Sequence, residues 1–261
     1  MDINTYRRIR RLFHSYSGRF TGYDEVIQQN IDVKRDHILH VSRIIKEIAI
    51  SIGMNSEQIR LAACIGLFHD IGRFGQYTTY NTFSDANSEN HSEIALRVLD
   101  ENRFLKNLTD NEISIIKVSV INHNRPAIPA EAEGDALLFS KLIRDADKLD
   151  IFRILITYYN NPEWVGENET IRLGLPDKPE ISVHVYEQVM NGKMVKLENL
   201  RTVSDFKVFQ AAWVYDINFN YTLKQIIRND YINRLLDTLP QIEETEMIKK
   251  KINLFLRLKE K

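Results

Sequence analysis

The sequence predicts an all-α fold, in which a multi-helical core carries additional N- and C-terminal helices. Apolar residues recur at intervals of three and four over most of the 261 residues, which is the spacing of one helix face. Only ten glycines and six prolines occur, too few for a turn-rich β architecture. Capping residues also begin several of the periodic stretches, and glycines end them. We therefore expect a single all-α domain over residues 1–261.

The composition narrows the class of protein. Hydrophobic residues make up 43% of the chain and charged residues 27%, which suits a globular domain with a sizeable core. The formal net charge of −1 provides no overall basic field, so we expect no duplex nucleic acid partner. No apolar run approaches the roughly 20 residues of a membrane span, so we expect no membrane partner. The single cysteine, Cys64, fits a reducing compartment and predicts a cytoplasmic protein.

The first half of the chain contains most of the clear helical patterns. Helices are expected at residues 5–20, 34–52, about 56–70, 91–102, 111–123 and about 135–160. Gly53 is a good C-cap for the second of these helices, and Gly72 stops the third. Asn55 or Ser56 caps the third helix, and Thr109 or Asp110 caps the fifth. Residues 75–90 lack a helical period and residues 124–134 are rich in proline, so both are expected to be loops.

The second half begins with an irregular stretch. Residues 161–181 contain several prolines and glycines, and a small hairpin near residues 171–186 remains an alternative. A short helix is expected near residues 182–191, and the chain is helical again from Ser204 onward. Apolar stripes on the late helices either pack within the chain or form a homodimer.

Helix faces distinguish the candidate ligands from surface residues. His37 lies on the apolar stripe of Val41 and Ile48, whereas His40 lies near Arg43 and Glu47 at a polar edge. If one of the two histidines is a ligand, His37 is the better candidate.

Later histidines also occupy inward faces at helix ends. His91 opens one predicted helix and His123 closes another, each with apolar residues one and two turns away. Asp147 shares the apolar face of its helix, whereas Asp145 is directed toward Lys141 and is expected to be an outer residue.

These inward residues point to a metal site. A lone histidine on an apolar face is more often a hydrogen-bonded core residue, but several buried histidines and aspartates would each need a separate partner. One shared metal site satisfies all of them. The adjacent His69 and Asp70 stand at the end of the apolar run of the third predicted helix, where a buried charge also needs a partner. The candidate ligands are His37, His69, Asp70, His91, His123 and Asp147. Imidazole and carboxylate ligands without thiolate favour Fe, Mn, Zn, Ni or Co, with Mg as a further candidate.

The order of these residues resembles the signature of a known family. His37, then His69-Asp70 in the sequence HDIG, then Asp147 in the sequence RDADKLD, is similar to the HD-domain superfamily of metal-dependent phosphohydrolases. The resemblance covers about residues 30–155, which form the expected HD core. Residues 180–261 are expected to be a C-terminal helical extension.

The resemblance implies a ligand set and a number of ions. His37, His69, Asp70 and Asp147 are expected to hold a first divalent ion. His91 and His123 match the histidines of two-metal members, with Asp70 as the bridge. Some two-metal members carry adjacent histidines at the later position, where this chain has His123-Asn124, so one or two ions are expected. The chain lacks the GYP tripeptide of the cyclic-dinucleotide phosphodiesterase subtype.

The predicted function is hydrolysis of a phosphomonoester or phosphodiester bond in a nucleotide or another small phosphorylated metabolite. Metal ions would activate a water molecule for attack on phosphorus. Asp70 and Arg73 are the candidate catalytic residues. Arg73 is expected to bind a phosphate oxygen; the alternative is a surface arginine at the C-terminal end of a helix. The candidate substrate-binding residues are Arg73, Gln76, Arg125 and Lys148.

Several alternatives remain open at this stage. The same ligand set also suits an HD-type di-iron oxygenase. A third hypothesis is a non-catalytic, metal-stabilised ligand-binding protein. Arg144 and Lys148 flank Asp147 and either meet phosphate or form salt bridges with Asp145 and Asp150. Asp150 could instead accept a hydrogen bond from a histidine ligand.

Overall fold

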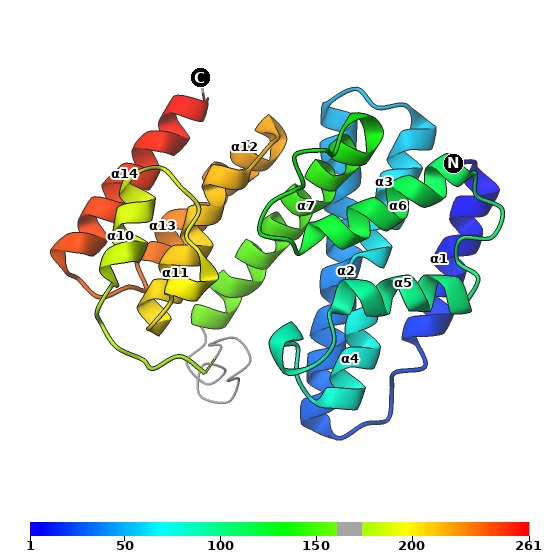
Figure 1. The fold of residues 1–261 in the computed structure, drawn as a ribbon, viewed down its shortest axis with the longest axis horizontal. Helices are drawn as coiled ribbons and strands as arrows, with labels where there is room; N and C mark the ends of the chain where they lie inside the picture. The colour runs from blue at the N-terminus through cyan, green and yellow to red at the C-terminus, as the bar shows by residue number, and fades with distance from the viewer. Residues whose placement is uncertain (161–173, 261) are drawn as a thin grey trace. The chain divides into compact units, whose positions relative to one another are not determined.

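The computed structural model describes residues 1–160 and 174–260, which form two compact units, Met1–Asp150 and Ile151–Lys261 (Figure 1). The described residues form helices and short 3₁₀ turns and contain no strand, so the predicted all-α class is confirmed. The boundary lies close to the predicted end of the HD core near residue 155. The prediction of a single domain over the whole chain stays a prediction.

The first unit is built from the N-terminal helices. In chain order these are α1 (Ile3–Ser17), α2 (Glu25–Ser51), α3 (Ser56–Phe68), α4 (Gly72–Tyr80), the 3₁₀ turn η1 (Asp85–Asn87), α5 (His91–Glu101), α6 (Asp110–His123) and α7 (Gly134–Tyr159). Helix α7 runs across the boundary between the two units. The predicted helices over 91–102, 111–123 and 135–160 are confirmed to within a residue or two at each end.

Side-chain caps decide where two of these helices begin. Asn55 caps α3 in a capping box with Gln58, and Thr109 caps α6 in the same way with Glu112. These contacts select Asn55 over Ser56 and Thr109 over Asp110. Asp24 caps α2, so this helix starts nine residues before the predicted Lys34.

Helix α4 corrects the prediction of a loop over residues 75–90. Its sequence, GRFGQYTTY, combines two glycines with two threonines and therefore has a low intrinsic helix propensity. Tertiary packing overrides this propensity, because Phe74, Gln76 and Tyr77 are buried and α4 packs on α5 and α2. The loop prediction holds only from Asn81 onward, apart from the single turn η1.

Two glycines permit close contacts between helices in the first unit. Helix α2 packs along α3, and a Cβ added at Gly66 would lie 2.6 Å from the Cα of Ser42 on α2. A Cβ at Gly72 would lie 2.7 Å from the amide nitrogen of Ala95 and closer still to the carbonyl oxygen of His91. Both helix pairs therefore approach backbone to backbone, which brings the residues after α3 near the start of α5.

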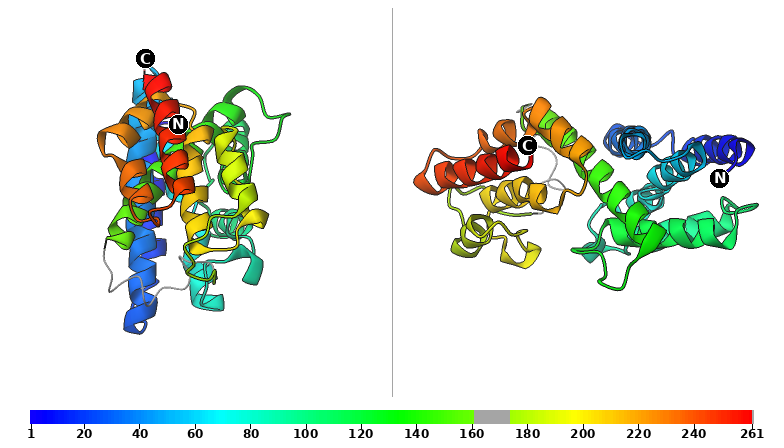
Figure 2. Two further views of the ribbon diagram at one scale, coloured as in Figure 1. Left: turned by 90° about the vertical axis from the view of Figure 1, so that its left-hand side faces the viewer. Right: turned by 90° about the horizontal axis from the view of Figure 1, so that it is seen from above.

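The second unit contains the remaining helices, coloured yellow to red in Figure 1 and Figure 2. They are α10 (Val183–Met190), η2 (Leu197–Asn199), α11 (Val203–Ala211), η3 (Ala212–Asp216), α12 (Asn220–Arg228), α13 (Tyr231–Leu236) and α14 (Glu243–Glu260). Helix α14 packs on α10, α12 and α13 and buries Ile248, Ile252 and Leu256. The apolar stripe of the last helix thus packs within this unit, and the alternative of a homodimer stays a prediction.

Two sequence predictions concern the start of the second unit. The short helix expected near residues 182–191 is confirmed as α10. Residues 161–173, within the predicted irregular segment 161–181, lie outside the described residues. Residues 174–182 are irregular as predicted, and no strand forms over residues 174–186. None of the described helices has both the length and the apolar character needed to cross a membrane.

Candidate metal centre

The candidate ligands come from five separate segments of the first unit, mostly from helix ends. His37 lies within α2, and His69 and Asp70 lie in the junction between α3 and α4. His91 is the first residue of α5 and His123 the last residue of α6, as predicted. Asp147 lies in α7. Helix ends place side chains at the boundary of the core, where a polar site can form without interrupting a helix.

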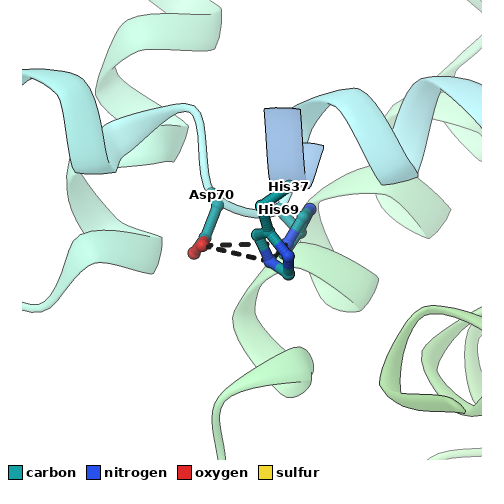
Figure 3. A group of neighbouring side chains, drawn as sticks. All are labelled: His37, His69 and Asp70. Atoms are coloured by element: carbon teal, nitrogen blue, oxygen red, sulfur yellow. Dashed lines mark hydrogen bonds and ion pairs between the residues drawn. The ribbon is translucent and has the colours of Figure 1, made fainter. Parts of the chain in front are cut away.

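The first group consists of His37, His69 and Asp70, all of them buried. The two Nε2 atoms of His37 and His69 lie 3.3 Å apart, and the Oδ2 atom of Asp70 lies 3.6 Å and 3.8 Å from them (Figure 3). The two imidazoles and the carboxylate converge on the same small space. One metal ion could contact all three ligand atoms, because they lie within 4.8 Å of one another.

Asp147 extends this first group to the four predicted ligands. Its Oδ1 atom lies 3.1 Å from His37 Nε2 and 3.7 Å from His69 Nε2. Its side chain is 16% exposed, whereas the two histidine side chains are at most 1% exposed. The first group therefore has an edge near Asp147 that solvent can reach.

The second group consists of Asp70, His91 and His123. The Oδ1 atom of Asp70 lies 3.3 Å from His91 Nε2 and 3.6 Å from His123 Nε2. The two Nε2 atoms are 3.0 Å apart, and both histidines are buried. Asp70 thus directs Oδ2 to the first group and Oδ1 to the second, the arrangement of a carboxylate that bridges two ions.

The Nδ1 atoms of the four histidines contact acceptors outside the two groups. His69 and His123 each donate to the backbone carbonyl three residues earlier, at 2.8 Å to Gly66 and 2.6 Å to Val120. A carbonyl oxygen can only accept, so these rings carry the proton on Nδ1 and direct the Nε2 lone pair into the site. The other two contacts are with carboxylates, His37 with Asp150 at 2.8 Å and His91 with Asp85 at 2.8 Å. Such contacts orient the imidazole ligands of metal ions.

Residues 35–151 match the family model of the HD domain. This part of the chain is an HD domain. The family consists largely of metal-dependent hydrolases, and the six candidate ligands all lie within the matched residues. No curated protein and no solved structure matches the chain.

Charges within the HD domain set the protonation of the ligands. Burial opposes protonation of His37, but its hydrogen bonds to Asp147 and Asp150 outweigh burial and raise its pKa to about 9. Burial lowers the pKa of His69 to about 3, and burial together with the nearby Arg73 lowers that of His91 to about 4. At neutral pH these two rings are neutral and able to bind a cation, whereas His37 would release a proton on doing so.

The Asp70 carboxylate is ionised despite its burial. Burial alone would raise the pKa of Asp70, but the positive charges of Lys34 and Arg73, together with His69, hold this pKa well below its usual range. Lys34 Nζ lies 3.0 Å from Oδ2, and Arg73 Nε lies 3.4 Å from Oδ1. The HD domain therefore stabilises a negative charge at the point shared by both groups.

Lys34 and Asp85 were not among the residues predicted for the site. Lys34 stands three residues before His37, one helical turn away on nearly the same face, so the spacing used for the histidines could have found it. Asp85 lies in the irregular segment before α5, where no periodicity indicates the direction of a side chain. By contrast Asp150, considered from sequence as an acceptor for a histidine, does contact His37.

Arg73 and Gln76 have protein partners. The Arg73 guanidinium, in addition to its contact with Asp70, donates to Gln76 Oε1 at 2.7 Å and to Asp85 Oδ1 at 3.2 Å. Gln76 is fully buried and donates to Asp85, Ser88 and the carbonyl of Glu89. The Gln76 side chain thus fastens α4 to the following segment, and its contact with substrate stays a prediction. Arg73 remains next to Asp70, where the prediction placed it.

The buried guanidinium of Arg144 holds the chain after α6. It donates to the backbone carbonyls of Asn122 at 3.1 Å and Pro126 at 3.3 Å, and to that of Arg125. Carbonyls at the end of a helix lack partners within the helix, so a buried guanidinium supplies them. Arg144 thereby fixes the segment that contains His123.

Asp145 is fully buried, so the prediction of an outer residue is wrong. Helix α7 is buried around most of its circumference here, from Leu142 to Ala146 and again from Lys148 to Asp150, and the face opposite the apolar stripe is therefore also covered. Lys148 is buried and Arg125 is exposed. Their roles in substrate binding stay predictions.

Proposed function

We propose that the protein is a metal-dependent phosphohydrolase that cleaves a phosphomonoester or phosphodiester bond in a nucleotide or another small phosphorylated metabolite. The observation that carries this proposal is the Asp70 carboxylate, which directs one oxygen toward each of two histidine pairs. A shared carboxylate is typical of centres in which two ions about 3.5–4 Å apart act on one phosphoryl group. The nitrogen and oxygen donors suit one or two ions of Fe, Mn, Co, Ni or Zn, with Mg as a further candidate.

The residues of the HD domain would each contribute a definite part to this reaction. Bound ions would supply Lewis-acid activation of a water molecule and of the phosphoryl oxygen. Asp70 would orient the centre through both oxygens. Lys34 and Arg73 place two positive charges beside it, where negative charge gathers on the phosphoryl oxygens in the transition state. The Lys34 side chain is 22% exposed, and a substrate phosphate can therefore approach it from solvent.

Elemental analysis of the purified protein, followed by a phosphate-release screen with each candidate metal, tests this function. We expect metal-dependent phosphate release from a phosphorylated metabolite under anaerobic conditions. Turnover that requires both iron and oxygen, without phosphate release, would instead support the di-iron oxygenase. Stoichiometric metal with no turnover of either kind would support a ligand-binding protein.

Single substitutions test the ligand assignment itself. His69→Ala should remove the first ion and abolish turnover while the circular dichroism spectrum stays helical, because His69 Nε2 points directly at Asp70 and Asp147. His91→Ala should lower the metal content from two equivalents toward one. The matched control is His184→Ala on α10, whose side chain is 78% exposed and outside the HD domain. Full metal content in His69→Ala would contradict the assignment.

A further inference from the structure

The two candidate ion sites differ in how their histidines are held. Each group contains one histidine whose Nδ1 faces a backbone carbonyl and one whose Nδ1 faces a carboxylate. The carboxylate that contacts His37 in the first group is that of Asp150, which lies on α7 and is fully buried. The carboxylate that contacts His91 in the second group is that of Asp85, which lies in η1 and has a side chain that is 30% exposed. The second group therefore depends on a short surface segment, whereas the first is held from the core.

Asp85 accepts hydrogen bonds from three separate parts of the first unit. Its two oxygens lie 2.9 Å and 2.8 Å from His91 Nδ1, at the start of α5. Oδ1 also accepts from Arg73 at 3.2 Å and from Gln76 at 2.9 Å, both on α4. Oδ2 accepts from Asn124 at 3.2 Å, immediately after His123. One carboxylate thus joins α4 to the start of α5, which carries His91, and to the end of α6, which carries His123.

The neighbours of Asp85 fix it in this position. Buried Gln76 bonds to Ser88 Oγ at 2.8 Å and to the Glu89 carbonyl at 2.9 Å, which fastens the chain on the far side of η1 to α4. Arg73 also donates to the carbonyl of Phe83, before η1. Both flanks of the turn are therefore held by side chains of α4, and the carboxylate is directed inward to His91.

We propose that Asp85 is the positioning residue of the second ion site, holding His91 for the ion and Arg73 for the phosphoryl group. This inference rests on the proposed function. Without the carboxylate, the Nδ1–H of His91 and one arm of the Arg73 guanidinium lose a charged acceptor, and the imidazole can rotate about its side-chain bonds. No contact of Asp85 with His37, His69 or Asp147 occurs among the hydrogen bonds and ion pairs of the described residues. The loss should therefore fall on the second ion alone.

Titration with Mn²⁺ of the wild-type chain and of Asp85→Ala, with the bound ion counted after equilibrium dialysis, tests the proposal. We expect the wild-type chain to bind two ions. Asp85→Ala should bind the first ion with unchanged affinity, while its affinity for the second ion falls about 10–100-fold. This is the usual effect of removing the hydrogen-bond partner of a ligand histidine. Asp85→Asn keeps an acceptor oxygen and should recover part of the loss. The control is Asp100→Ala on the same helix as His91, since Asp100 pairs with Lys117 and is 56% exposed.

The outcomes separate this inference from the proposed function. Two ions bound by Asp85→Ala with wild-type affinities would overturn the role of Asp85, as would a wild-type chain that binds a single ion. Equal weakening of both sites, or no recovery in Asp85→Asn, would show a merely structural role and also overturn it. A wild-type chain that binds ions but releases no phosphate would contradict the proposed function and leave the metal-binding result for Asp85 intact.

Discussion

The close contact between α4 and α5 at Gly72 predicts that Gly72→Ala lowers the free energy of unfolding. In Gly72→Ala the new Cβ would lie 2.7 Å from the amide nitrogen of Ala95 and closer still to the carbonyl oxygen of His91, whereas an ordinary contact begins at 3.4 Å. The helices must therefore separate by more than about 0.7 Å. The obstructing atoms include backbone of α5, which cannot rotate away as a side chain can. Overpacking of this kind costs about 1–3 kcal/mol.

The displacement should also reach the second ion site. His91 is the first residue of α5, and its Nε2 lies 3.3 Å from Asp70 Oδ1. Metal–ligand distances tolerate deviations of only about 0.2 Å, so a shift of this size should weaken binding of the second ion. At about 2–4 °C per kcal/mol, the Tm should fall by about 2–12 °C. Differential scanning calorimetry and Mn²⁺ titration measure the two effects.

Gly75→Ala is the matched control, three residues later in the same helix. A Cβ at Gly75 would have no heavy atom within 4 Å, so only helix propensity changes, by up to about 1 kcal/mol in favour of alanine. We expect an equal or higher Tm and two bound ions. If Gly72→Ala kept the wild-type Tm and metal content, the steric argument would be refuted. If Gly72→Ala and Gly75→Ala lost equal amounts of stability and metal, the cause would be the replacement of any glycine in α4 and not the close contact at Gly72.

Two further predictions concern protonation and the end of α6. In the presence of a chelator, the free energy of unfolding should be greatest near pH 6.5. The pKa of His37 in the folded chain, about 9, lies above the unfolded value of 6.5, so the stability that protonated His37 contributes is lost as the pH rises toward 9. The pKa values of His69 and His91 are lowered in the folded chain, so these two residues reduce the stability as the pH falls below 6.5. Urea midpoints between pH 4 and 9 measure this, and a flat profile would contradict it. Arg144→Ala should lower the free energy of unfolding by about 2–3 kcal/mol, because buried carbonyls after α6 lose a charged donor. A change within 0.5 kcal/mol in chemical denaturation, roughly that of a surface substitution, would rule out this role.

Helix positions and inward faces were largely predictable from the chain. The predicted placement of His91 at a helix start and His123 at a helix end agrees with the structure because capping residues and apolar spacing act within a few residues. The choice of His37 over His40 depended on the same local spacing. Helix α4 escaped prediction because its propensity is poor and its stability comes from burial of Phe74 and Tyr77 against other helices.

The all-α class, the candidate ligand types and the helix faces on which they lie follow from the order of neighbouring residues, so they could be predicted without a structure. The packing of the helices shows which oxygen of Asp70 faces which histidine pair, and that Lys34 contacts Asp70 and Asp85 contacts His91. It also shows that Arg144 supports the backbone after α6. These contacts could not be predicted because they join residues from different helices and loops. Their distances depend on how the helices pack, and local periodicity carries no information about that packing.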